Sequence, residues 1–474
     1  MRMRTARPVV VVGGGLAGIA AALTLGRAGV PTLLLDSRQV LGGRVRSFGD
    51  PERDNGQHVF LGCCERLIRL LDTLGLGAET TLQERARVPV VDIHGRIGLL
   101  GSRGPLDAVG PLAALASYRH LNAWERASAL WAAARLDGEA RAAETEGRGG
   151  AFRTGLFSDW LREHRQGPRA RRYFWDLLTT PTLNAAPERV STAAAAFVLR
   201  KALFGGPDTL RVGWARSALS AWIHGAALRS LSSLGLEVRL RHKVHRIVFG
   251  GEHVIGVECP QGTIETGRIV LALPPHRLRS ILPDRLAKRP PFSSAGRIES
   301  SAIVGVHLRF DRPIGAPEIL ATPDSPLEWI FNTTRIRGAE AETEAEQELS
   351  IVLSDAGRWL PLTADRIIAC MREALPLVLP EAGSARLVDA KVHREPHATI
   401  VPSPRTEKLR PPQATEIPGL TLAGAWTDTG GWPSTMEGAV VSGERAARAI
   451  IQDPPPNACP SRANLGLSRG TAPI

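Results

Sequence analysis

The sequence predicts an α/β protein: a Rossmann-like domain with a parallel sheet, into which a second domain of mixed α+β structure is interleaved. A β-branched run, Val9 to Val12, suits a strand buried on both faces and leads directly into Gly13-Gly-Gly-Leu-Ala-Gly18. A helical apolar pattern follows over residues 17–28, and Thr32 to Leu35 is typical of a second strand. The length of 474 residues exceeds what one hydrophobic core usually supports, which favours two domains.

Composition is that of an ordinary globular protein. Apolar residues make up 43% and charged residues 22%, without an apolar run long enough to span a membrane. The basic start, Met1 to Arg7, leads into glycines rather than into an apolar signal core, so we expect a cytoplasmic protein. The five cysteines show neither CxxC nor Cys/His spacing, so we expect no disulfide and no metal site.

The net charge is +12, and arginine supplies nearly all of the excess. A basic surface suits nucleic acid or an anionic membrane, but no nucleic-acid module or interleaved aromatic pattern accompanies it. We therefore expect no nucleic-acid partner. Peripheral contact with a membrane, and so membrane association, stays open. The sequence does not indicate an oligomeric state.

The glycines of the N-terminal unit meet separate demands of dinucleotide binding. Gly13 makes the tight turn, Gly15 lets the backbone approach a pyrophosphate, and Gly18 lets helix and strand pack closely. Leu16 and Ala17 open the helix, whose free N–H groups and positive dipole end suit phosphates. Strand, turn, helix and strand follow in the expected order, which a chance glycine-rich turn would not produce.

The next loop indicates which dinucleotide is bound. Asp36, eighteen residues after Gly18, suits both hydroxyls of a ribose without a 2′-phosphate. In Asp36-Ser37-Arg38 the arginine suits the adenosine end, and in Gly42-Gly43-Arg44 the glycines permit a close approach while the arginine suits phosphate. This spacing resembles the second fingerprint of the flavin amine oxidase and phytoene desaturase superfamily, and the resemblance implies non-covalent FAD.

Two later segments strengthen that resemblance. Ile269 to Pro275 is similar to the strand that returns to the FAD domain, and Leu420 to Gly424 to its last strand. The superfamily then has a helix whose N-terminus faces the pyrimidine ring of the flavin, which implies contacts from Gly424, Ala425, Thr435 and Met436. Val244 matches the superfamily's backbone contact to adenine.

One position departs from the superfamily pattern. An acidic residue usually follows the glycine of the last strand, but this chain has Ala425 there. Asp428 or water is a candidate substitute, so the contact at this end of the cofactor is open.

A narrower resemblance, to the hydroxysqualene dehydroxylase family, extends over nearly the whole chain. It implies removal of the hydroxyl of an apolar C30 isoprenoid, hydroxysqualene, by reduced FAD. Two alternatives stay open: an FAD-dependent desaturase or amine oxidase, and a prenyl-lipid escort protein without redox chemistry. The matching segments are Asp54-Asn-Gly-Gln-His58 with Leu61 to Cys63, Trp175 to Asn184, Val306 to Pro313 and Ala423 to Thr429.

The dehydroxylation needs a proton for the departing water, and the segment 54–58 is the best-placed source. His58 is the candidate acid, and Asp54 is the candidate group to orient it or to stabilise developing positive charge. Gly56 and Gln57, with His58, are candidate contacts to the flavin ring. The alternative is that Asn55-Gly56 is an ordinary hairpin turn and His58 a structural histidine.

Three further segments bear on the substrate. Residues 112–136 and 193–204 carry apolar patterns that suit either a hydrocarbon tunnel or a satellite core. Residues 276–289 combine leucines with basic groups, which suits either a solvated helix or a membrane contact.

We expect the FAD domain at 1–75, 215–275 and 396–451, and the substrate domain at 76–214 and 276–395. Within the FAD domain, Leu236 to Phe249 alternates as a strand. We expect a solvated linker or short helix at 339–348 and a disordered tail at 452–474.

Overall fold

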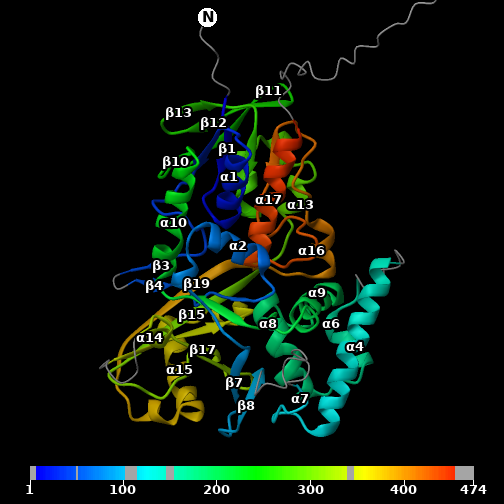
Figure 1. Ribbon diagram of the computed structural model, residues 1–474, viewed down its shortest axis with the longest axis vertical. Helices are drawn as coiled ribbons and strands as arrows, with labels where there is room; N and C mark the ends of the chain where they lie inside the picture. Colours follow the sequence, from blue (N-terminus) through cyan, green and yellow to red (C-terminus); the bar gives the residue numbers. More distant parts are fainter. Residues whose placement is uncertain (1–6, 50–51, 102–114, 146–153, 339–345, 454–474) are drawn as a thin grey trace, which may run out of the picture.

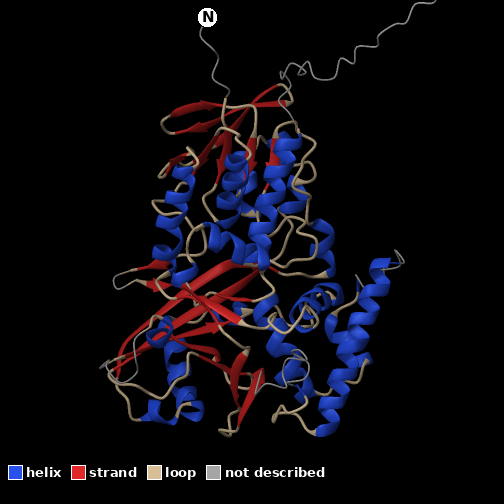
Figure 2. Cartoon of the chain, viewed as in Figure 1, coloured by secondary structure: helices blue, strands red, loops and turns tan. Residues whose placement is uncertain are grey.

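The computed structural model describes residues 7–49, 52–101, 115–145, 154–338 and 346–453. Along the long axis of the molecule, a parallel sheet covered by helices occupies one part, and a larger sheet with a helical layer occupies the other (Figure 1). Figure 2 shows the strands of both parts with helices packed beside them. The predicted α/β class with an interleaved second domain is therefore confirmed. Most of the tail predicted to be disordered, and 339–345 of the predicted linker, lie outside the described residues.

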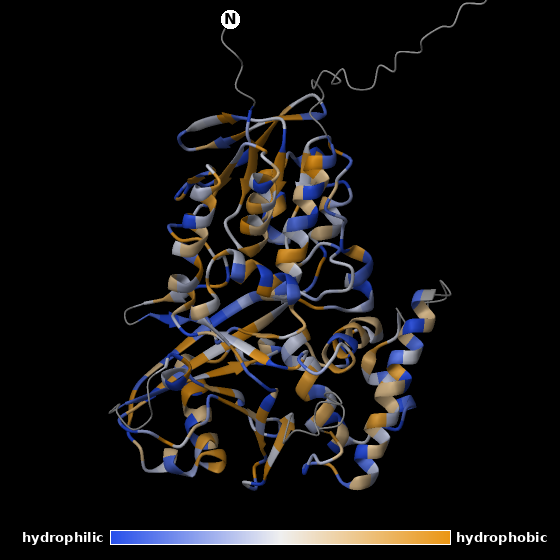
Figure 3. Ribbon diagram, viewed as in Figure 1, coloured by the Kyte–Doolittle hydropathy of each residue, from blue (hydrophilic) through white to orange (hydrophobic). Residues whose placement is uncertain are grey.

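The parallel sheet explains the four-valine run. Its strands, all pairing in parallel, are β10 (Glu237–Arg239), β2 (Thr32–Leu35), β1 (Val9–Val12), β14 (Ile269–Leu271) and β20 (Leu420–Leu422). Val9 and Val11 pack on one face with α1 (Leu16–Arg27), α10 (Leu219–Ser233) and α17 (Met436–Gln452). Val10 and Val12 pack on the other face with the three-stranded layer β11 (Arg246–Gly250), β12 (His253–Cys259) and β13 (Gly262–Glu265). A strand that is buried on both faces has apolar side chains on both, so its sequence is a continuous apolar run rather than an alternation of apolar and polar residues. Figure 3 shows these strands as largely hydrophobic.

The larger sheet has seven strands. In spatial order they are β19 (Leu387–Ile400), β15 (Ser300–Phe310), β18 (Gln347–Leu353), β17 (Glu328–Asn332), β16 (Ile319–Thr322), β7 (Arg87–Val91) and β8 (Ile97–Gly101). Neighbours are antiparallel except β16 and β7. One core, which includes α15 (Ala364–Val378), forms mainly on β15, β17 and β18. The expected boundary at residue 396 falls inside β19, so this strand runs between the two parts.

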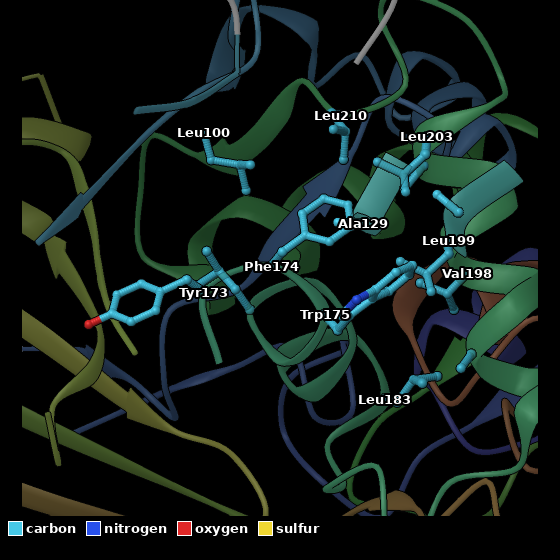
Figure 4. Close-up of a cluster of buried hydrophobic side chains, with 14 of the residues drawn as sticks. Leu100, Ala129, Tyr173, Phe174, Trp175, Leu183, Val198, Leu199, Leu203 and Leu210 are labelled. Carbon is cyan, nitrogen blue, oxygen red and sulfur yellow. The ribbon is translucent and has the colours of Figure 1, made fainter. Parts of the chain in front are cut away.

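A helical layer forms a separate core. Its elements are α4 (Ala123–Thr145), α6 (Phe157–Glu163), α7 (Pro168–Ala170), the π-helical turn η3 (Arg171–Trp175), α8 (Asp176–Leu183) and α9 (Thr192–Leu203). Trp175 and Phe174 lie at its centre with Leu199 and Leu203, whereas Tyr173 points away toward the large sheet (Figure 4). The apolar pattern over 193–204 is therefore mostly core. In the pattern over 112–136, Leu121 and Leu136 are buried, whereas Trp124 and Trp131 are exposed; residues 112–114 lie outside the described part.

Shorter elements connect these layers. They are β3 (Ser47–Phe48), β4 (Arg53–Asp54), β5 (Val59–Leu61), α2 (Glu65–Thr73), η1 (Gly77–Glu79), β6 (Thr80–Leu82), β9 (Val212–Ala215), α11 (Pro275–Ile281), α12 (Asp284–Ala287), α13 (Phe292–Ala295), α14 (Thr333–Ile336), η4 (Ala356–Trp359), η5 (Pro380–Gly383) and α16 (Pro404–Leu409). Strands β5, β9 and β6 pair as a small sheet beside the FAD-domain helices.

The single strand expected from Leu236 to Phe249 was wrong. The structure has β10 and β11, separated at 240–245, where Arg241 adopts a left-handed conformation with φ of 57°. Backbone N–H groups of Arg241 and His242 donate to the carbonyls of Arg38 and Asp36. Leu240 and His242 are partly buried and Val244 is buried, whereas Arg241 and Lys243 are exposed. The alternation of the sequence therefore continues through the bend and could not locate it.

The basic segment 276–289 folds as two short helices, α11 and α12. Leu278, Ile281 and Leu282 are buried against the FAD domain. Because its apolar side chains face the core, this segment does not present them to a membrane.

Candidate functional site

The N-terminus of α1 is built to receive an anion. Gly15 caps the helix with no side-chain hydrogen bond, and the first turn contains no acidic residue, so its N–H groups have no carboxylate partner there. Gly13 has φ of 109°, and a Cβ on Gly18 would lie 1.8 Å from the Gly13 carbonyl oxygen. The turn and the helix therefore fit together only without side chains, as dinucleotide binding requires.

Asp36 lies at the end of β2, beside this cradle. Its Oδ2 accepts from the Gly14 N–H at 2.6 Å, and its Oδ1 accepts from the Arg38 N–H at 2.7 Å. A carboxylate has about four acceptor positions, so these bonds leave room for ribose hydroxyls. Ser37 is exposed at the turn. Val244 lies two residues after His242, whose N–H donates to the Asp36 carbonyl, and the backbone contact of Val244 with adenine stays a prediction.

The second glycine loop packs directly on the first. The Gly42 N–H donates to the Gly14 carbonyl at 2.8 Å, and a Cβ on Gly43 would lie 2.9 Å from the Gly15 Cα. Arg38 Nη1 donates to the Gly43 carbonyl at 2.7 Å, which braces the second loop internally. The two glycine loops are therefore in direct contact.

Arg44 extends from this loop toward β19, where its Nη1 donates to the carbonyls of His397 and Ala398. Its side chain is accessible to solvent, yet desolvation by surrounding protein lowers its pKa. Arg44 therefore links the second glycine loop to β19 while its side chain stays accessible. Its other guanidinium N–H groups remain available for phosphate, which stays a prediction.

The segment 54–58 lies beside the loop that carries Arg44 and beside β15. Asn55 Nδ2 donates to the Arg44 carbonyl at 2.8 Å. Gly56, with φ of 125°, is pressed against β15, where a Cβ on Gly305 would lie 3.2 Å from its Cα. Gln57 is buried. The structure therefore places Asn55 against the loop that carries Arg44, and Gly56 against β15.

His58 is partly accessible, and its Nδ1 lies 3.0 Å from the Gly56 carbonyl. The carbonyl can only accept, so Nδ1 carries the proton and Nε2 is left for other partners. Desolvation by surrounding protein lowers the pKa of His58, so the ring is neutral near pH 7. His58, the candidate acid, is therefore unprotonated in most molecules near pH 7.

Asp54 has a framework role in the described structure. Its Oδ1 accepts from the Ser47 hydroxyl at 2.7 Å and from the Leu219 N–H, the first of α10, at 2.9 Å. The carbonyl of Asp54 lies 2.8 Å from His307 Nε2 on β15. These contacts make Asp54 a positioning residue for the segment, and the proposed orientation of His58 by Asp54 stays a prediction.

The far end of the site is the N-terminus of α17. The Thr435 hydroxyl accepts from the Gly438 N–H at 3.2 Å and caps the helix at Met436. Gly424 has φ of 139°, and the Ala425 side chain is buried. Asp428 is exposed, and its carboxylate accepts from the Gly430 N–H at 2.9 Å. The Asp428 carboxylate thus stabilises the surface turn in which it lies, and its contact with the cofactor stays a prediction.

Two residues that sequence reasoning missed hold this end in place. The buried Arg410 donates to the carbonyls of Ala425, Thr427 and Trp432 and to the Thr429 hydroxyl. Glu437 is buried in the first turn of α17, and its carboxylate accepts from the N–H groups of Arg66 and Leu67 at the start of α2. No local sequence motif identifies either residue. Glu437 bonds to a helix that is distant in sequence, and Arg410 bonds to the backbone and hydroxyl of a loop without regular structure.

The paired glycine loops, the uncapped α1 terminus and the α17 terminus define a flavoprotein oxidoreductase that binds FAD. The chain belongs to the family of flavin containing amine oxidoreductases, whose model matches residues 16–451. It is 29% identical over 459 residues to the hydroxysqualene dehydroxylase of Sinorhizobium fredii, covering 94% of this chain and 98% of that protein. It is also 25% identical over 480 residues to a 15-cis-phytoene desaturase of Narcissus pseudonarcissus, covering 94% and 79%.

Solved structures support the fold. A putrescine oxidase bound to putrescine superposes with a TM-score of 0.71 at 18% identity, covering 94% of this chain and 99% of that one. The cyclohexylamine oxidase of Brevibacterium oxydans superposes with a TM-score of 0.69 at the same identity, again over 94% and 99%. In the part of the chain that the structure describes, no helix is long and apolar enough to cross a bilayer.

Proposed function

We propose that this chain removes the hydroxyl group of hydroxysqualene reductively and releases squalene. The observation that carries the proposal is similarity over 94% of the chain to two hydroxysqualene dehydroxylases, from Sinorhizobium fredii and Rhodopseudomonas palustris, both at 29% identity. The segment 54–58, on which the narrower resemblance rests, packs on the loop of the second FAD fingerprint.

The reaction breaks one C–O bond and forms one C–H bond. Reduced FAD supplies the hydride, and the departing hydroxyl needs a proton to leave as water. We assign the delivery of that proton to His58, with Nε2 as the delivering atom because Nδ1 is held by the Gly56 carbonyl. Asp54 keeps the segment in position through Ser47 and Leu219.

The lowered pKa of His58 gives this role a pH signature. Only a small fraction of the ring is protonated at neutral pH, so turnover is expected to rise as the pH falls toward that lowered pKa. The His58→Ala variant is expected to keep its FAD and to lose turnover by roughly a hundredfold or more, together with the rise at low pH.

The test is anaerobic incubation of the protein with chemically reduced FAD and hydroxysqualene, followed by analysis for squalene. Squalene from the wild type and its loss in His58→Ala support the proposal. Absence of squalene, with desaturation of phytoene under oxidising conditions, would favour the desaturase. Full turnover by His58→Ala would remove His58 as the acid but leave the reaction assigned. A protein that stays colourless after FAD is added would favour the escort role.

A further inference from the structure

The end of the molecule farthest from the three-stranded layer displays isolated apolar side chains. Ile93 and Ile97 lie at the turn between β7 and β8 and are 42% and 64% exposed. Trp124, in the first turn of α4, is 82% exposed. Both elements reach the lower end of the long axis in Figure 1. Large apolar side chains scattered singly on a surface are common, so these three gain significance only from lying at one end of the molecule.

These side chains stand on a rigid base. Asp92 is fully buried, and its carboxylate accepts from the N–H groups of His94 and Arg96, which fixes the turn. His120, just before α4, packs against Gly98 of β8, and its Nε2 lies 2.9 Å from the Val90 carbonyl. The hairpin and the segment just before α4 are therefore in contact, which places the exposed residues on neighbouring elements.

Cationic side chains lie beside the apolar ones. Arg96 lies between the two isoleucines, pairs with the Asp92 carboxylate at 2.6 Å and keeps 59% of its side chain exposed. Arg119 is exposed just before α4, and Glu125 follows Trp124 in the first turn of that helix. A hollow of about 500 Å³ adjoins the hairpin, since Asp324 on its wall accepts from the Ile93 N–H at 3.4 Å. Arg172 and Arg358 line this hollow with Trp359 and Leu362. Asp324 is the facing carboxylate, and Tyr173 donates to its Oδ2 at 2.7 Å.

We propose that this end, which we name the hairpin face and define by Ile93, Arg96, Ile97, Arg119 and Trp124, docks on an anionic phospholipid bilayer. The isoleucines and the tryptophan would enter the boundary between headgroups and acyl chains, where an apolar side chain and an indole are both favourable. The arginines would meet lipid phosphates, in agreement with the net charge of +12. The choice of a bilayer as partner rests on the proposed function, because a C30 isoprenoid substrate dissolves in membranes.

The test measures co-sedimentation of the FAD-loaded protein with two kinds of vesicle. One contains phosphatidylcholine alone, and the other contains about three parts phosphatidylcholine to one part phosphatidylglycerol. We expect binding to the anionic vesicles that weakens as salt is raised. Ile97→Glu and Trp124→Glu should each weaken that binding about tenfold, since each replaces an inserted apolar group by a repelled carboxylate.

The matched control is Ile255→Glu. Ile255 is 43% exposed on β12, at the opposite end of the long axis, so the same change there alters net charge equally without touching the hairpin face. Wild-type protein that does not bind anionic vesicles, or equal weakening by Ile255→Glu and Ile97→Glu, would overturn the proposal. Flavin content and far-ultraviolet circular dichroism check the folding of each variant.

Turnover in detergent-solubilised substrate separates this inference from the proposed function. If the hairpin face only docks on the bilayer, Ile97→Glu should retain turnover in detergent while losing vesicle binding. Vesicle binding by a wild type that produces no squalene would leave the docking surface standing and refute only the reaction.

Discussion

Replacing Gly15 by alanine should separate FAD binding from folding. Gly15 has φ of −75° and ψ of 177°, which any residue adopts, and the nearest heavy atom to an added Cβ is the Gly43 Cα at 3.7 Å. That distance is an ordinary van der Waals contact. Loss of the glycine cap lowers the free energy of unfolding by some tenths of a kcal/mol. Alanine also restricts the unfolded chain, which raises the free energy of unfolding by about as much. The free energy of unfolding of the FAD-free protein should therefore change by less than about 0.5 kcal/mol.

FAD affinity should respond differently, because the pyrophosphate must approach the backbone at Gly15. A methyl group there displaces it from the α1 N–H groups, and we expect at least a hundredfold weaker binding, or about 2.7 kcal/mol. The assay is titration of the FAD-free protein by quenching of flavin fluorescence, with thermal unfolding of the same sample. Wild-type affinity in Gly15→Ala would refute the assignment of this cradle.

Gly18→Ala provides the contrast. Its Cβ would lie 1.8 Å from the Gly13 carbonyl oxygen, and that backbone atom cannot move away like the end of a flexible side chain. Both the stability of the FAD-free protein and FAD affinity should fall. If Gly18→Ala unfolded like wild type, the close packing of α1 on the turn would be incorrect.

Two further predictions concern buried charge. Arg410→Met should lower the free energy of unfolding by about 2–4 kcal/mol, measured by urea denaturation, because its four acceptors in the loop 425–432 lose their donor; wild-type stability would contradict its anchoring role. Burial raises the pKa of Asp176 to about 7, and its Oδ1 has no hydrogen-bond partner among the described residues. A raised pKa in the folded state means that the stability associated with Asp176 is full below about pH 4 and is lost as the pH rises through 7. Asp176→Asn should therefore be more stable than wild type at pH 8 and equal to it near pH 4, and an unchanged difference across that range would contradict the burial argument.

The parts of the fold that could be predicted were those determined by interactions between residues close together in the sequence. The glycine turn, the valine strand and the helix after it occupy consecutive residues, and the backbone needs of a dinucleotide select glycine at fixed spacing. The break at Arg241 could not be predicted in this way. A left-handed arginine is uncommon, and the bend is set by hydrogen bonds to Asp36 and Arg38, some two hundred residues earlier in the chain.

The site was predicted less completely than the fold, for a related reason. Sequence reasoning identified 54–58, but it could not show that the Asp54 carboxylate is taken by Ser47 and the start of α10. Glu437 was missed because its partners, the N–H groups at the start of α2, lie 371 and 370 residues away. A buried carboxylate that caps a distant helix has no periodicity, and only the assembled fold reveals it.

Those contacts explain how the flavin end tolerates Ala425. Arg410 reaches the carbonyl of Ala425 rather than its side chain, so the loop before α17 is held by main-chain bonds that any residue at 425 would provide. Gly443 of α17 meets α1 so closely that a Cβ there would lie 2.1 Å from the Ala17 carbonyl oxygen. The N-termini of α1 and α17, which we predict to contact the cofactor, are thereby fixed relative to each other. The loop at 425 is therefore held in place without an acidic side chain. The Glu437 carboxylate in the first turn of α17 accepts from the N–H groups at the start of α2. We predict that the N-terminus of α17 faces the flavin, where its positive dipole end would stabilise electron-rich reduced flavin. Such an arrangement would suit an enzyme whose proposed reaction begins from reduced FAD.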